Sequence, residues 1–169
     1  KFDIQKLRWM NASHIIKKKA DDLLPLIKDQ LSAAQVDISG VTDEFLVKLI
    51  DLYKIRLKTL REFVAMTDCF FRDDFAVEEE GKKKYLGKAE NIENIRALAD
   101  RLEKLDEFTS ANIEAASREL AEERRLKAAN LIHPARLAVS GKAAGAGLFE
   151  MMELLGKDKV LKRLRGITP

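Results

Sequence analysis

Apolar residues recur at spacings of three and four along most of this sequence, which is the period that gathers them on one face of an α-helix. The pattern is clear from Phe45 to Tyr53, from Leu57 to Phe71 and from Ile92 to Leu105. The alternating pattern of a β-strand persists nowhere long enough to predict a sheet. The sequence therefore predicts an all-α protein whose helices bury these apolar stripes.

Residues that start and stop helices divide the chain further. Thr42 is predicted to cap the helix that carries Phe45 to Tyr53, and Ser110 to cap a helix that begins after the periodicity stops at 106–109. Other helices are expected at 131–139, at 148–155 and after Gly156 through Leu164, with Gly141 as a left-handed residue. The break near 106 predicts two packed helical subdomains, residues 1–106 and 107–169.

Length and composition limit the class of protein. With 169 residues and 46% hydrophobic content, the chain is long enough for one domain or two small subdomains with a packed core. No stretch approaches the ~20 consecutive apolar residues of a membrane span, and the N-terminus lacks the zones of a signal peptide. The single cysteine, Cys69, cannot form an internal disulfide and is expected to be a buried, inert thiol. We therefore expect a soluble, cytoplasmic monomer without membrane contact.

The sequence contains no motif for catalysis or cofactor binding. The glycine-rich segment from Ser140 to Gly147 is not a P-loop, because its lysine directly follows the first glycine and no hydroxyl residue comes after it. The same segment lacks the preceding strand and third glycine of a dinucleotide fingerprint. His14 and His133 lie far apart, without a cysteine or carboxylate at a metal-ligand spacing. We predict no catalytic residue, no metal site and no cofactor in this chain.

Positive charge is clustered, although the net charge is only +3. Such clusters are either solvated helix faces or contacts to a polyanion, and composition alone leaves both readings open. The clusters are Lys17 to Lys19, Lys82 to Lys84, Arg124 and Arg125 with Lys127, and Lys162 and Arg163 with Arg165.

Two segments, Phe2 to Asn11 and His133 to Lys157, resemble parts of the glutamyl-tRNA synthetases of bacterial type. Phe2 to Asn11 is similar to the F-D-x-x-K-L-x-W-M/L-N stretch with which that family enters its helical C-terminal half. His133 to Gly141, followed by Gly147 to Glu150 and Leu154 to Lys157, resembles the family's P-x-R-x-A-x-T-G, P-G-L-F-E and L-L-G-K run. The second match is the more specific, because it spans a loop and two helices at fixed spacing. The resemblance extends over the whole chain.

This resemblance implies a two-part helical cage that takes the anticodon loop of tRNA(Glu) between its parts. It also implies that the catalytic domain is missing here, so that this chain binds RNA but is inactive alone. In the full-length parent, a class I synthetase domain would activate glutamate with ATP and Mg²⁺ and join it to tRNA. No cofactor is expected in the present chain.

The resemblance assigns two residues of the first part to the anticodon. Arg56 falls where discriminating members carry the arginine that reads the third anticodon base; the alternative is a solvated helix arginine. Trp9 matches a position near the anticodon, where it either contacts a base or fills the core between the first helices. Both residue types suit single-stranded RNA, which is read by stacking on aromatic or guanidinium planes and by hydrogen bonds to base edges.

Five residues of the second part complete the predicted anticodon site. The resemblance makes His133 and Arg136 base-reading residues and Leu148 an apolar contact in the same pocket. Where some relatives have Thr-Pro, this chain has Gly145 and Ala146, which lack the hydroxyl and the ring but keep the backbone amides. Backbone contact with the middle base is therefore expected, and glycine allows a close approach.

Two alternatives remain open at this point. The same amphipathic faces suit a helical scaffold that docks another protein instead of RNA. The parent enzyme could also be non-discriminating and accept tRNA(Gln), and Arg56 favours the discriminating type.

Overall fold

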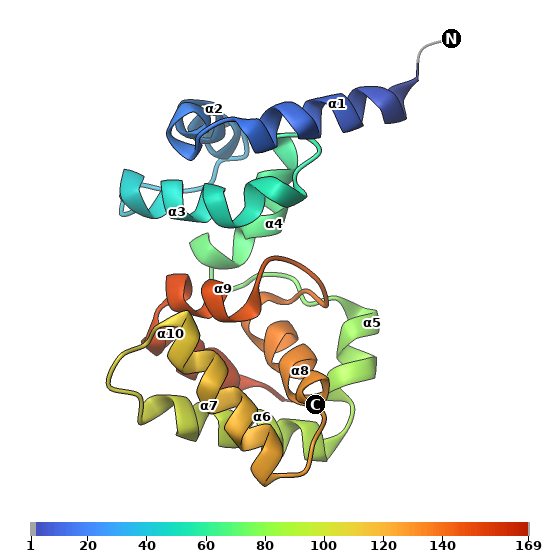
Figure 1. Cartoon of the computed structure of the whole chain (residues 1–169), viewed down its shortest axis with the longest axis vertical. Helices are drawn as coiled ribbons and strands as arrows, with labels where there is room; N and C mark the ends of the chain where they lie inside the picture. Colours follow the sequence, from blue (N-terminus) through green and yellow to red (C-terminus); the bar gives the residue numbers. More distant parts are fainter. Residues whose placement is uncertain (1–2, 169) are drawn as a thin grey trace. The chain divides into compact units, whose positions relative to one another are not determined.

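The computed structural model describes residues 3–168, and Figure 1 shows its helices. No strand occurs within these residues, so the all-α prediction is confirmed. Every helix within these residues is too short or too polar to span a lipid bilayer. The elements, including a 3-10 turn (η1) and a π-helical turn (η2), are α1 (Ile4–Lys17), α2 (Ala20–Ala33), α3 (Asp43–Tyr53), η1 (Lys54–Arg56), α4 (Arg61–Phe71), α5 (Glu79–Gly81), η2 (Lys82–Leu86), α6 (Ala89–Glu103), α7 (Ser110–Glu123), α8 (Ala128–Ser140), α9 (Leu148–Leu155) and α10 (Lys157–Gly166).

The chain forms two compact units, Lys1–Asp73 and Asp74–Pro169. This division differs from the subdomains 1–106 and 107–169 that the sequence predicts. The break in periodicity near 106 is the connection between α6 and α7, which pack together in the second unit. Arg101 of α6 pairs with Glu119 and Glu123 of α7. An interrupted apolar stripe marks the end of a helix, but it does not reveal which helices share a core.

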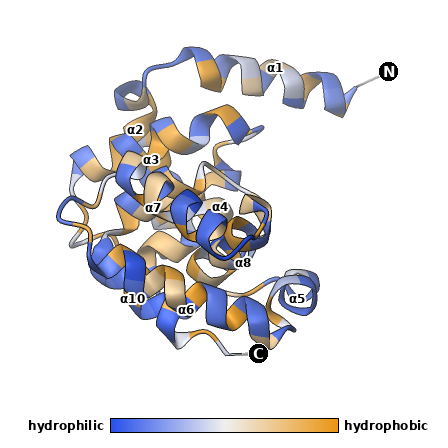
Figure 2. Cartoon of the chain, turned by 60° about the horizontal axis from the view of Figure 1, so that its bottom comes forward, coloured by the Kyte–Doolittle hydropathy of each residue, from blue (hydrophilic) through white to orange (hydrophobic). Residues whose placement is uncertain are grey.

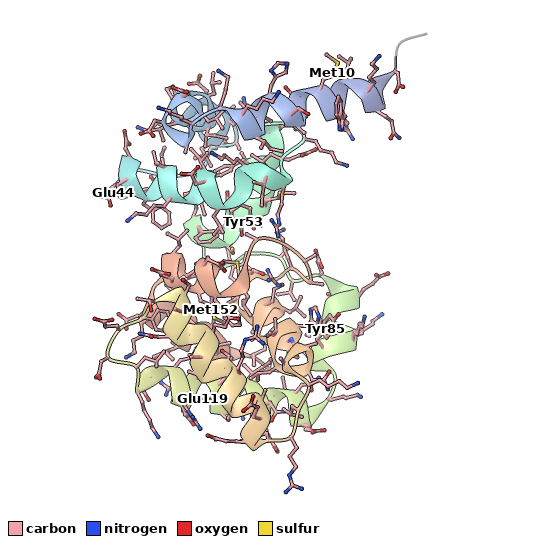
Figure 3. The ribbon with its side chains drawn as sticks, viewed as in Figure 1. Met10, Glu44, Tyr53, Tyr85, Glu119 and Met152 are labelled. Atoms are coloured by element: carbon pink, nitrogen blue, oxygen red, sulfur yellow. The ribbon has the colours of Figure 1, made fainter. Side chains whose placement is uncertain are left out.

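The first unit is built around an aromatic cluster. Tyr53 at the end of α3, labelled in Figure 3, meets the rings of Phe63 and Phe70 of α4 edge to face, at centroid distances of 6.5 Å and 6.0 Å. Such edge-to-face pairs add to the stabilisation that burial itself provides. Asn11 of α1 donates a hydrogen bond from Nδ2 to the carbonyl oxygen of Lys58, 2.6 Å away. This bond holds α1 beside the connection between η1 and α4.

The second unit is organised around α6, which packs against α7, α8 and α10. Figure 2 shows hydrophobic and hydrophilic residues on different sides of the same helices, as an amphipathic stripe requires. Arg165 of α10 donates hydrogen bonds to Glu103 and Asp100 of α6, both at the exposed ends of these helices. The hydrogen bond from Arg165 lowers the pKa of Glu103 below its ordinary value. The ion pair joins the terminal helix to α6 at the surface.

Local signals in the sequence are mostly confirmed. The Thr42 side chain accepts a hydrogen bond from the Phe45 amide, as expected of an N-cap, and Cys69 is buried. The predicted cap at Ser110 is wrong by one residue. Thr109 is the N-cap, since its side chain accepts from the Asn112 amide, and Ser110 is the first helical residue. Neighbouring hydroxyl residues are equivalent by sequence, and the backbone conformation decides between them.

Gly141 ends α8 in the left-handed conformation that the sequence predicts, with a φ of +72°. A Cβ atom at this position would overlap the carbonyl oxygen of Ala76. The carbonyl oxygen of Gly141 accepts a hydrogen bond from the Glu78 amide at 2.8 Å. The Glu78 carboxylate in turn accepts one from the Ala143 amide at 2.9 Å. The segment before α5 thus fixes the start of the loop between α8 and α9.

We predict that Gly141→Ala lowers the free energy of unfolding by at least about 1 kcal/mol, because an L-residue with a side chain pays roughly that amount in the left-handed region before any clash is counted. Urea unfolding followed by circular dichroism measures the change. Gly40→Ala is the matched control, since a Cβ there meets nothing within 4 Å. Equal losses in the two variants would show that Gly141 has no special role.

Candidate nucleic-acid interface

Trp9 lies on the exposed surface of α1, with 70% of its accessible area retained. Asn11 faces the connection between η1 and α4, and two residues along a helix are about 200° apart, so Trp9 points away from that connection. The residue that α1 buries is instead Ile15, more than one turn further along. Trp9 therefore does not fill the core between the first helices, and its ring is accessible to a ligand.

Arg56 is the last residue of η1 and is exposed to solvent. It stands between two buried residues, Tyr53 and Leu57, which fix the backbone on both sides. Lys54 of the same turn donates a hydrogen bond from Nζ to the carbonyl oxygen of Lys18, 3.2 Å away, so η1 is tied to the end of α1. Arg56 is thus a charged side chain at the surface of the first unit, on a turn that buried residues and a hydrogen bond anchor.

His133 and Arg136 lie three residues apart on α8, a spacing that places them on one face of the helix. Both side chains are half-buried. Arg136 donates a hydrogen bond from Nη1 to the carbonyl oxygen of Ala146, 2.6 Å away. The structure therefore brings Arg136 and the loop between α8 and α9 together, as expected for a common site.

The loop presents its three predicted residues in different ways. Gly145 is exposed, and a Cβ there would be in ordinary contact with Arg136 Nη1 at 3.5 Å, so Gly145 lies beside the guanidinium. Ala146 is fully buried, and its carbonyl oxygen already accepts from Arg136. Leu148, the first residue of α9, retains only 4% exposure. The accessible part of this group is therefore Gly145 together with the half-buried His133 and Arg136, while Leu148 and Ala146 support it from beneath.

The four basic clusters divide into two kinds. Lys17 to Lys19 and Lys82 to Lys84 are exposed. In the other two clusters, three of the four arginines make structural contacts. Arg124 bonds to the buried Asn94, Arg163 bonds to the Val139 carbonyl oxygen and covers the ring of Phe75, and Arg165 pairs with α6. The exposed lysines are therefore the better candidates for phosphate contacts.

Sequence reasoning missed one residue beside this group, Tyr85 of η2, whose ring stacks on His133. The available signal was an aromatic residue directly after three lysines, a composition typical of surfaces that bind single-stranded nucleic acid.

Within residues 3–168, no group of three or more His, Cys, Asp and Glu side chains is arranged to hold a metal ion.

Comparison with known families decides what kind of domain this is. The family model described as "Anticodon binding domain" matches residues 17–168. The chain belongs to this family of anticodon-binding domains.

Individual relatives narrow the comparison. This anticodon-binding domain is 36% identical to glutamate–tRNA ligase 2 of Caldicellulosiruptor saccharolyticus over 163 residues, which are 96% of the chain and 34% of the relative. It is also 36% identical to the glutamate–tRNA ligase of Bacillus licheniformis over 169 residues, 98% of the chain and 35% of the relative. The chain thus spans about a third of the length of the curated relatives it matches.

A solved structure shows the same fold. The crystal structure of a glutamate–tRNA ligase from Elizabethkingia meningosepticum, in complex with its amino acid, superposes with a TM-score of 0.85 at 26% identity. The match covers 96% of this anticodon-binding domain and 32% of that chain.

We predict that Arg136→Ala lowers the free energy of unfolding by about 1.5–3 kcal/mol, the usual value of a hydrogen bond that involves a charged group. Amides of residues 143–147 should exchange hydrogen faster, because the loop loses its bond to α8, while helicity is retained. Arg118→Ala is the matched control, since the exposed Arg118 pairs with Glu114 one turn away on α7 and its loss should change stability by under about 0.5 kcal/mol. Unchanged exchange in the loop would show that Arg136 does not anchor it.

Proposed function

We propose that this chain binds the anticodon loop of tRNA(Glu) as part of a longer glutamate–tRNA ligase. The observation that carries the proposal is the family match over residues 17–168, together with curated relatives that are glutamate–tRNA ligases. The remaining part of the protein would join glutamate to tRNA with ATP and Mg²⁺. We further propose that the protein acts as a cytoplasmic monomer.

Each unit offers groups suited to unpaired bases. The first unit has the exposed ring of Trp9 for stacking and the exposed guanidinium of Arg56 for hydrogen bonds. The second unit has Arg136 and His133 on one face of α8, with Gly145 leaving backbone atoms accessible beside them. In this proposal Ala146 and Leu148 hold the loop in place, because their side chains are buried. Aromatic and guanidinium planes are the groups with which proteins bind single-stranded loops.

Trp9 is the only tryptophan of the chain, so its fluorescence reports binding directly. We predict that an unmodified tRNA(Glu) anticodon stem-loop quenches this fluorescence and binds at least about tenfold more tightly than the same stem with a scrambled loop. If about three phosphates are contacted, affinity should fall roughly twentyfold between 50 and 200 mM salt. Equal affinity for both loops would favour the alternative of a protein-binding scaffold.

Arg56 would distinguish the third anticodon base. Anticodons for glutamate end in cytosine, whose pairing edge offers the acceptors O2 and N3 to a guanidinium that carries only donors. Anticodons for glutamine end in guanine, whose N1–H and N2–H₂ donors would oppose the guanidinium. A good two-pronged contact of this kind is worth about 1–3 kcal/mol, or roughly ten- to a hundredfold in affinity.

We predict that Arg56→Gln reduces the ratio of affinities for cytosine-ending and guanine-ending loops by roughly ten- to a hundredfold, because an amide can turn a donor or an acceptor to either base. Paired titrations of the two stem-loops measure this ratio. Arg61→Gln provides the matched control, since Arg61 is also exposed and begins the next helix. An unchanged ratio would mean either that other residues read the third anticodon base or that the parent enzyme accepts both tRNAs.

A further inference from the structure

Tyr85 and His133 form a stacked pair of rings at the surface of the second unit. Their centroids are 5.3 Å apart and their planes are inclined by only 18°. We infer that this pair is a stacking platform for one unpaired base of the RNA, with Tyr85 as an additional residue of the interface. The inference rests on the proposed function and adds a specific subsite to it.

The backbone holds Tyr85 in a defined position on α8. A Cβ atom at Gly81 would lie 2.8 Å from Leu137 Cδ1, so the backbone at the start of η2 packs directly against the buried side chain of Leu137. Leu137 is one helical turn after His133 and therefore on the same face. At the other end of η2, Asn91 donates a hydrogen bond from Nδ2 to the Tyr85 carbonyl oxygen, 2.7 Å away. Figure 3 shows Tyr85 beside α8.

The pair is ordered but not part of the core. Tyr85 and His133 are both half-buried, whereas the adjacent Leu86 and Pro134 are buried. His133 Nδ1 is buried and finds no hydrogen-bond partner within the described part of the chain. Buried polar atoms without a partner destabilise a fold and are uncommon, so packing alone gives no reason for a histidine here. A flat ring fixed at the surface is what a stacked base requires.

The charge around the pair suits an RNA backbone. Lys82, Lys83 and Lys84 precede Tyr85 in η2 and are exposed. Lys84 Nζ lies 5.1 Å from the centroid of the Tyr85 ring. Lys84 itself is exposed, so it can leave the ring for a phosphate at small cost. Aromatic platforms next to flexible basic side chains are the common means of binding single strands.

The test measures the affinity of the full chain for the unmodified anticodon stem-loop. Loss of one base-stacking contact weakens binding roughly five- to a hundredfold. We expect that loss for Tyr85→Ala and for Tyr85→Leu, which keeps an apolar side chain against His133 but has no π-face. Tyr85→Phe keeps the ring and should bind like the wild type. Lys83→Ala should lose affinity mainly at low salt, which separates charge from stacking.

Abasic substitutions in the RNA identify the stacked base. Removing one particular loop base should weaken binding to the wild type but have no further effect with Tyr85→Leu, because the contact is already lost. Equal affinities of the wild type and Tyr85→Leu, or an unchanged abasic profile, would overturn the inference while leaving the proposed function intact. If the wild type does not prefer the tRNA(Glu) loop to a scrambled loop, the proposed function itself fails.

Discussion

Burial of one apolar face is what helices α6 to α10 depend on, because none of them is long enough to be stable by itself. The longest within residues 3–168, α6, has 15 residues, and isolated helices of that length are marginal in water. Its fully buried residues include Ile95, Leu98 and Leu102, on the face that packs against its neighbours. Because α8 packs on α6, the position of His133 and Arg136 depends on this core as well. The geometry of the candidate site in the second unit thus depends on the hydrophobic packing of α8 against α6.

The features that the sequence predicts well are those decided locally. A stripe of period 3.6, a hydroxyl residue at an N-cap and a glycine after a helix act within a few residues, so Thr42, Gly141 and the bounds of α9 were all recognisable. The division into compact units is different. Asp73 ends the first unit because of contacts between residues far apart in the chain. A pattern of period 3.6 says that a face is buried, but not which helix buries it.

The candidate site, like the fold, could be predicted from the sequence only in part. Motif resemblance selected Arg136 and Gly145, and the hydrogen bond from Arg136 to Ala146 joins the two halves of that motif. Exposure was not predictable, because the same apolar residue type can face a ligand or the core. Trp9 is at the surface, whereas Leu148 is beneath the loop. The sequence did not predict Tyr85 as a site residue, because its stacking partner, His133, is 48 positions away in the chain. Only the fold brings the two rings together.

Two departures from ordinary helical preference meet at that contact. Pro134 lies inside α8, where proline removes a backbone hydrogen bond and disfavours a helical conformation for the preceding residue, His133. Tyr85 belongs to a single π-helical turn, a rare form that recurs at functional sites. Proline inside a helix is not diagnostic alone, since α2 contains Pro25. Proteins keep such local costs where the surrounding packing compensates for them and function requires the resulting geometry. The coincidence of both departures at one stacked pair therefore separates it from an ordinary surface contact.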